Sequence, residues 1–161
     1  MRKKTIEDYV ELVYDLQKDR KKVHTNDIAK YFDVKPSSVT EIFQKLSKEG
    51  YINYEKYGGV TVAKKGRKIA IKTKEKHTKL KEFLILLGVD NKVAEKDACE
   101  MEHILNEKTM NAVIKFVEVV NKCDMTPLWL KRLEEYIKTG ELKSCPSEIA
   151  EICLKYSKQK N

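Results

Sequence analysis

Apolar side chains recur at helical spacing through almost the whole chain, and this periodicity limits the fold more than any other feature of the sequence. The pattern predicts helices at about residues 5–19, 25–32, 36–48, 64–87, 91–105, 109–121, 127–138 and 146–157. Residues 51–62 interrupt it, because β-prone residues there flank Gly58 and Gly59, which is typical of a two-stranded hairpin. We expect Thr5 and Thr25 to cap the first two helices and Pro36 to lie in the first turn of the third. The sequence therefore predicts a mainly α protein with one hairpin.

The first part of the chain has the element order of a winged helix-turn-helix, namely helix, short helix, tight turn, helix and hairpin. Its third helix would bury its apolar side chains and expose hydroxyl, amide and lysine groups, which suit hydrogen bonds to DNA bases and phosphates. The expected DNA contacts are Lys35, Pro36, Ser37, Ser38, Thr40, Gln44, Lys45, Lys56 and Tyr57. Further phosphate contacts are expected from Lys64, Lys65, Arg67 and Lys68. The alternative is that Ser37 and Ser38 only cap a helix and that the hairpin only covers the core.

The positive charge of the chain is confined to its N-terminal half. The net charge is +8, and residues 1–76 contain 19 Lys and Arg against 11 Asp and Glu, whereas residues 77–161 contain 14 of each. A basic half joined to a neutral half indicates a module that binds a polyanion, attached to a part with another task. The alternative is a lysine-rich surface that only keeps the protein in solution. Because no apolar run approaches the roughly 18 residues of a membrane span and the start lacks a signal-peptide pattern, we expect a cytoplasmic protein.

Three potential metal ligands stand together in the second half of the chain. Cys99, Glu102 and His103 are spaced i, i+3 and i+4, so a helix presents all three side chains on one face. Asp8 and Glu11 repeat the i, i+3 spacing on the first helix, and His77 lies on the long helix between them. If these helices converge, thiolate, carboxylate and imidazole groups surround one pocket suited to a transition metal. Taken one by one, the same residues also fit ordinary roles in a helix turn, a solvated face or the core.

Four cysteines are too few for a disulfide scaffold and lack the paired CxxC spacing of a zinc ribbon. We expect Cys123, Cys145 and Cys153 to be small buried hydrophobic residues. An alternative function is a metal-independent winged-helix regulator that senses oxidants, either through pairing of Cys145 with Cys153 or through reaction of Cys99. A metalloenzyme with Glu100 or Glu102 as base would lack a signature such as HExxH and would leave the basic half unexplained, so no enzyme is predicted.

Four short motifs resemble the diphtheria-toxin-repressor and manganese-transport-regulator family of metal-dependent repressors. They are IEDYVE at 6–11, VKPSSVT at 34–40, YEKYGG at 54–59 and ACEMEH at 98–103, and the likeness covers about residues 5–120. The resemblance implies a homodimer that binds double-stranded operator DNA, with a winged helix-turn-helix domain at 1–74 and a helical metal-binding and dimerisation domain at 75–161. It implies as metal ligands Asp8, Glu11, His77, Cys99, Glu102 and His103, with Glu95 and Glu100 as candidates for a second metal position. The SH3-like third domain of the iron branch is not expected here.

The implied ligand set is a hybrid of two branches of that family. The manganese branch shares Asp8, Glu11 and His77 but usually has Glu where this chain has Cys99, whereas the iron branch has Cys there and usually Met in place of Asp8. A thiolate favours Fe(II), Co(II), Ni(II) or Zn(II), and carboxylates suit Mn(II) or Fe(II). The favoured ion is therefore Fe(II), with Mn(II) next. The resemblance implies a repressor of iron or manganese uptake genes that divalent metal activates.

Overall fold

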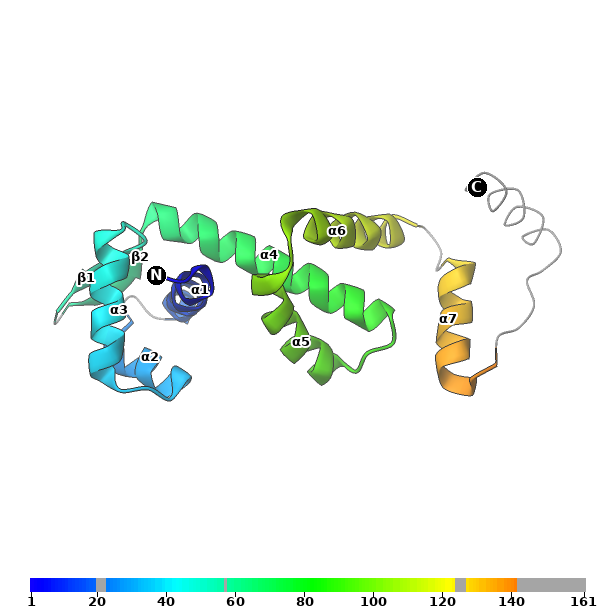
Figure 1. Ribbon diagram of the computed structural model, residues 1–161, viewed down its shortest axis with the longest axis horizontal. Coiled ribbons are helices and arrows are strands. Elements are labelled where there is room, and N and C mark those ends of the chain that lie inside the picture. The colour runs from blue at the N-terminus through cyan, green and yellow to red at the C-terminus, as the bar shows by residue number, and fades with distance from the viewer. Residues whose placement is uncertain (20–22, 57, 124–126, 142–161) are drawn as a thin grey trace.

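The computed structural model describes residues 1–19, 23–56, 58–123 and 127–141. Its helices are α1 (Lys3–Asp19), α2 (Thr25–Phe32), α3 (Pro36–Lys48), α4 (Lys64–Leu86), α5 (Asn91–Ile104), α6 (Glu107–Asn121) and α7 (Leu128–Thr139). Between α3 and α4 lie strands β1 (Ile52–Glu55) and β2 (Gly59–Val62) (Figure 1). The mainly α class and the hairpin are confirmed. The helix predicted at 146–157 lies outside the described residues.

The first three helices and the hairpin pack around one apolar core. Its fully buried side chains are Val10, Val13, Val23, Ile28, Val39, Phe43, Leu46, Val60 and Ala70. The two strands are antiparallel, with Ile52 opposite Val62, and Val23 forms a further bridge to Val60. The N-terminal turn of α4 covers this core at Gly66, where a Cβ atom would collide with the carbonyl oxygen of Tyr51. The predicted winged helix-turn-helix is thus formed, with the hairpin as its wing.

The predicted helix caps are partly wrong. α1 begins at Lys3, so Thr5 lies inside its first turn. Thr25 is the first residue of α2, and the N-cap residue is His24, whose backbone N–H donates to the Asp27 carboxylate at 2.9 Å. The Asp27 carboxylate therefore satisfies the backbone N–H of the N-cap residue, and the Thr25 hydroxyl is not the capping group. Pro36 is the first residue of α3, as predicted.

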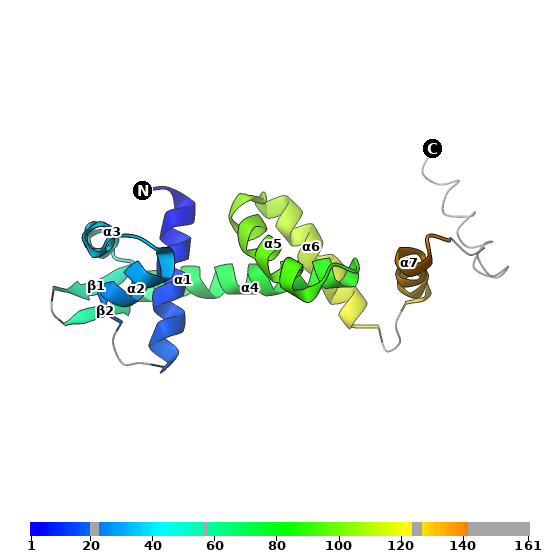
Figure 2. The ribbon, with the colours of Figure 1, turned by 90° about the horizontal axis from the view of Figure 1, so that it is seen from below.

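The long helix α4 connects the two halves of the chain. Its first part packs against α1, and its second part packs against α5 and α6 (Figures 1 and 2). The core of the second half is small, with Leu80, Ala98 and Met110 buried together. α6 begins two residues earlier than predicted because the Asn106 side chain accepts a hydrogen bond from the Lys108 N–H at 2.9 Å and caps it.

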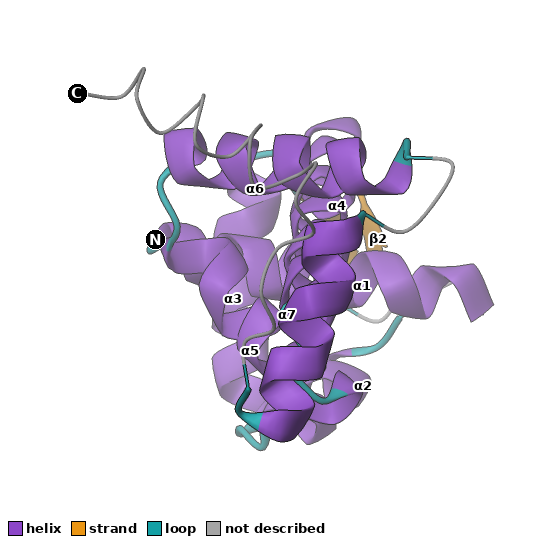
Figure 3. Cartoon of the chain, turned by 90° about the vertical axis from the view of Figure 1, so that its right-hand side faces the viewer, coloured by secondary structure: helices purple, strands orange, loops and turns teal. Residues whose placement is uncertain are grey.

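The helix α7 runs steeply past the end of the second half, below α6 in Figure 3. The ring of Trp129 lies 5.7 Å from that of Phe116, and Ile137 lies against Gly88 after α4. No SH3-like unit occurs among the described residues. In the part of the chain that the structure describes, no helix is both long and apolar enough to cross a membrane.

Candidate metal centre

A cleft of about 590 Å³ opens between α1, α4 and α5, where the two halves of the chain meet. Five of the six expected metal ligands line it: Asp8, Glu11, His77, Cys99 and Glu102. The sixth, His103, lies beside the cleft with its side chain 1% exposed, and its Nε2 is 2.9 Å from Oδ1 of Asp8. The fold therefore brings together three segments that are far apart in the sequence.

Carboxylates hold both nitrogens of the His103 ring. Nδ1 lies 3.0 Å from Oε2 of Glu7, and Nε2 lies near Oδ1 of Asp8 and 3.3 Å from Oε1 of Glu102. Burial alone would lower the pKa of His103, but hydrogen bonds to Asp8, Glu102 and Glu7 outweigh it and raise the pKa to about 11. In the metal-free protein this imidazole is therefore a cation surrounded by carboxylates.

The sequence interpretation missed Glu7. It is one of the few buried charged residues, and it lies three positions before Val10 on the side of α1 that faces the protein. A carboxylate on the buried face of an amphipathic helix is a detectable signal, because burial without a partner is costly. The partner, His103, is 96 residues away, and only the folded chain reveals it.

Glu102 links the two histidines. Its Oε2 lies 3.1 Å from Nδ1 of His77, while Nε2 of His77 lies 3.0 Å from Oε1 of Glu95. The hydrogen bond to Glu102 is the main reason why the pKa of His77 is raised. Burial would raise the pKa of Glu102, but hydrogen bonds from His103 and His77 dominate and lower it. Glu102 is thus an ionised carboxylate in a buried position.

Glu11 and Cys99 face the same concentration of negative charge. Burial, together with repulsion from Glu102 and Asp15, raises the pKa of Glu11 to about 7. Cys99 is an exposed residue, but partial burial of its thiol and the charge of Glu102 raise the pKa of the thiol. Crowded carboxylates that resist ionisation are relieved by a bound cation, so this donor set fits a divalent transition metal.

The donors contact one another instead of converging on a common point. Among the described residues, no group of three His, Cys, Asp or Glu side chains stands ready to hold an ion. Metal binding would require Nε2 of His103 to lose its proton and its hydrogen bond to Asp8. The candidates for a second position are also paired, since Glu95 lies 2.6 Å from Lys81 and Glu100 lies 3.0 Å from Lys4.

Most of the expected DNA-contacting side chains are exposed in the winged helix. Lys35, Pro36, Ser37, Ser38, Gln44, Lys45 and Lys56 are exposed. The Thr40 hydroxyl is half-buried and donates to the Pro36 carbonyl at 3.0 Å. Lys65 covers the Tyr51 ring and donates to the Glu49 carbonyl, so its position at the hairpin is fixed within the fold. Tyr57 lies outside the described residues.

The expectation of buried cysteines is wrong for Cys123. This residue follows α6 and is exposed, and its thiol donates to the Val119 carbonyl at 3.3 Å. It lies at a helix end, where the apolar face of α6 no longer covers the side chain. Cys145 and Cys153 lie outside the described residues.

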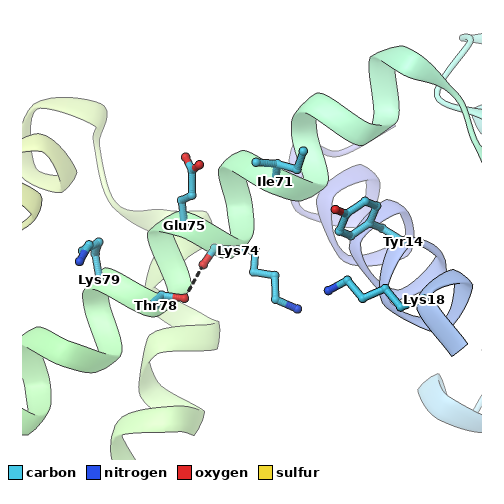
Figure 4. A pocket seen from close by; sticks show the side chains of 7 residues that line it. All are labelled: Tyr14, Lys18, Ile71, Lys74, Glu75, Thr78 and Lys79. Carbon is cyan, nitrogen blue, oxygen red and sulfur yellow. Dashed lines mark hydrogen bonds between the residues drawn. The ribbon is translucent and has the colours of Figure 1, made fainter.

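A second pocket, of about 300 Å³, lies between α1 and α4 (Figure 4). Lys18 and Lys74 extend toward one another across it, and both reach Asp15, at 2.7 and 2.6 Å. These ion pairs join α1 to α4 beside the cleft. They neutralise Asp15, which is why the pKa of Asp15 is lowered despite its partial burial.

A basic winged helix-turn-helix, a second helical unit and a cleft of carboxylate, imidazole and thiol groups between them define a class, the metal-dependent DNA-binding regulators. The family "Iron dependent repressor, N-terminal DNA binding domain" matches residues 1–60, and "Iron dependent repressor, metal binding and dimerisation domain" matches residues 63–128. The chain therefore belongs to the iron-dependent repressor family. It is a metal-dependent transcriptional repressor and not an enzyme, and its partners are DNA and a second copy of itself.

Similar proteins include regulators from archaea and bacteria. An uncharacterised HTH-type transcriptional regulator of Methanocaldococcus jannaschii is 39% identical over 116 residues, 71% of this chain and 93% of its own. The HTH-type transcriptional regulator MntR of Lysinibacillus sphaericus is 35% identical over 130 residues, 81% and 91% of the two chains. A solved manganese-dependent transcriptional repressor in complex with manganese has a TM-score of 0.64 at 25% identity and covers 70% of this chain, which spans about half (52%) of that one. None of these relatives supports the oxidant-sensing alternative.

Proposed function

We propose that this repressor binds a divalent transition metal in the cleft between α1, α4 and α5, and that the bound ion activates DNA binding. The proposed ligands are Asp8, Glu11, His77, Cys99, Glu102 and His103. The observation that carries the proposal is the origin of these side chains. Two come from α1 in the DNA-binding half, three come from α5 in the dimerisation half, and one comes from the helix that connects them.

An ion in this cleft would fix α1 relative to α5. In a dimer, the two recognition helices must enter major grooves about one helical turn, ~34 Å, apart. The metal-bound form would hold them at this separation, whereas the metal-free form would have to be ordered during DNA binding. Metal binding adds positive charge beside α1, but its main effect would be to position α3. A coupling free energy of ~1–3 kcal/mol corresponds to roughly 5–150-fold tighter DNA binding.

We propose Fe(II) as the favoured ion and Mn(II) as the next. Cys99 favours the later, softer ion, while the carboxylates of Asp8, Glu11 and Glu102 accept both. The curated relatives named MntR support Mn(II), and the descriptions of both matched domains support iron. The regulated genes would be those for iron or manganese uptake, since a repressor active only with metal bound shuts off supply when the ion is abundant.

A DNA-binding titration tests the proposal. An operator duplex would be selected from random sequence with the metal-loaded protein, and its affinity measured anaerobically by fluorescence anisotropy with chelator, Fe(II), Mn(II), Co(II) or Zn(II). We expect metal to tighten binding by roughly 5–150-fold. The Glu102→Gln variant should lose most of this response, and the matched control Glu75→Gln, an exposed carboxylate of α4, should keep it. Equal affinity with chelator and with every metal would refute the proposal.

A further inference from the structure

We propose that Glu7 is a positioning residue for the metal centre, and that it holds the His103 ring so that Nε2 is the nitrogen presented to the cleft. This inference rests on the proposed function, because it concerns how one of the proposed ligands is oriented. Glu7 does not line the cleft. It acts on the far side of the ring, through Nδ1.

The geometry separates the tasks of the two ring nitrogens. Oε2 of Glu7 lies 3.0 Å from Nδ1 of His103, whereas Nε2 points to Asp8 and Glu102, which line the cleft. Neutral imidazole carries one proton, and the hydrogen bond made by one nitrogen decides which nitrogen keeps it. With its proton held at Nδ1 by Glu7, the ring has its lone pair on Nε2 and directed toward the cleft.

The position of Glu7 in the fold favours this interpretation over that of a surface ion pair. Its side chain is 8% exposed, and that of His103 is 1% exposed. The other neighbour, Lys3, lies 3.7 Å away on the same helix and is 69% exposed, so it contributes little. A buried carboxylate is stable only with a good partner, and His103 is the close one among the described residues.

The His103 ring joins the two halves of the chain through two contacts instead of one. The adjacent residues Glu7 and Asp8 of α1 approach opposite nitrogens of one ring on α5. For Nε2 to hold an ion, His103 would have to give up its contact with Asp8, whereas the Glu7 contact at Nδ1 leaves Nε2 available. A carboxylate that accepts from the second nitrogen of a metal-bound histidine makes the ligating nitrogen more basic and fixes the ring orientation, and its loss typically weakens metal binding by about 10–100-fold.

The test compares Glu7→Gln and Glu7→Ala with a matched control, Glu107→Gln, which breaks an exposed ion pair between α6 and Lys72 of α4. In the full-length Zn(II)-loaded protein, ¹⁵N chemical shifts of the His103 ring report which nitrogen binds the ion and which nitrogen keeps the proton. Co(II) affinity is measured by competition with a chromophoric chelator, and Co(II) absorption reports the ligand field. We expect Glu7→Ala to lose the preference for a proton on Nδ1 and to bind Co(II) about 10–100-fold more weakly. Glu7→Gln should be the milder, since its amide oxygen still accepts a hydrogen bond.

Two results would overturn the inference: an unchanged preference between the two ring nitrogens in Glu7→Ala, or Co(II) affinity within about threefold of the unmodified protein in both variants. Glu7→Gln keeps the size of the side chain, so it controls for a change of the fold near the cleft in Glu7→Ala. His103→Ala separates this inference from the proposed function. If His103→Ala binds Co(II) normally, the proposed ligand set fails, whereas loss of binding in His103→Ala with normal binding in both Glu7 variants refutes only the role of Glu7.

Discussion

Replacing Glu11 with glutamine should stabilise the metal-free protein at pH 8 and have much less effect at pH 5. Burial and the charges of Glu102 and Asp15 raise the pKa of Glu11 from 4.5 to about 7. Below pH 4.5 the Glu11 carboxyl is protonated in both the folded and the unfolded chain, so its ionisation does not reduce the free energy of unfolding. Between pH 4.5 and 7 the unfolded chain releases the proton while the folded chain retains it, and the folded state loses stability as the pH rises. Above pH 7 Glu11 is ionised in the folded chain as well, and the loss of folding stability reaches its full value.

The size of the effect follows from the shift and from the exposure of the group. A change from 4.5 to about 7 corresponds to about 3 kcal/mol at ~1.4 kcal/mol per pKa unit, and because Glu11 is only half-buried, solvent screening reduces this to ~1–2 kcal/mol. Glutamine has nearly the same shape and no charge. Glu11→Gln should therefore raise the free energy of unfolding by ~1–2 kcal/mol at pH 8. At pH 5 the increase should be only a few tenths as large.

Urea unfolding at both pH values, followed by circular dichroism at one fixed protein concentration with chelator present, measures this difference. The control is Glu75→Gln, which removes an exposed carboxylate of α4 and should give the same change at both pH values. An equal effect of Glu11→Gln at pH 5 and pH 8, or a loss of stability at pH 8, would show that the carboxylates of the cleft do not repel one another as described. The same variant should weaken metal binding, since it removes an anionic donor.

Three other variants examine different parts of the molecule. Cys99→Glu should shift the ratio of Mn(II) to Co(II) affinity toward Mn(II) by about tenfold, because a hard donor replaces a soft one; competition titrations with both ions measure it, and an unchanged ratio would contradict the selectivity argument. Lys45→Ala, on the exposed face of α3, should weaken DNA binding and reduce the slope of log affinity against log salt by about 0.9; an unchanged slope would place this side chain away from phosphate. Phe43→Ala should reduce the free energy of unfolding by about 3–5 kcal/mol because this ring is completely buried; a loss below 1 kcal/mol would be inconsistent with that packing.

Periodicity and turn residues were sufficient to predict the element order. The apolar positions of α3 point inward as predicted, with Val39, Phe43 and Leu46 fully buried, because a helix that covers a core needs this spacing. The start of a helix was harder to predict. Thr25 is a residue type that often caps a helix, but Asp27 accepts a hydrogen bond from the backbone N–H of His24, one residue earlier. Which of the two residues becomes the N-cap depends on how the preceding chain enters the helix.

The candidate site was predictable where its members share a helix. Cys99, Glu102 and His103 lie on one face of α5 by spacing alone. The pairing of Glu7 with His103 depends on the crossing of α1 and α5, which no local pattern specifies. The same holds for Glu95, whose contacts with His77 and Lys81 arise from the packing of α4 on α5.

The length of α4 makes it a lever between the cleft and the DNA-binding surface. It contains 23 residues without a break, which corresponds to about 34 Å at 1.5 Å per residue. The cleft meets α4 at His77, which is about 20 Å from the start of the helix at Lys64. A change of ~10° in the direction of α4 at the cleft would therefore move the hairpin and α3 by about 3.4 Å. That displacement is close to the ~3.4 Å rise of one base pair. If the proposed function is correct, a rearrangement of the side chains around Glu102 that changes this angle would shift the two copies of α3 relative to their half-sites.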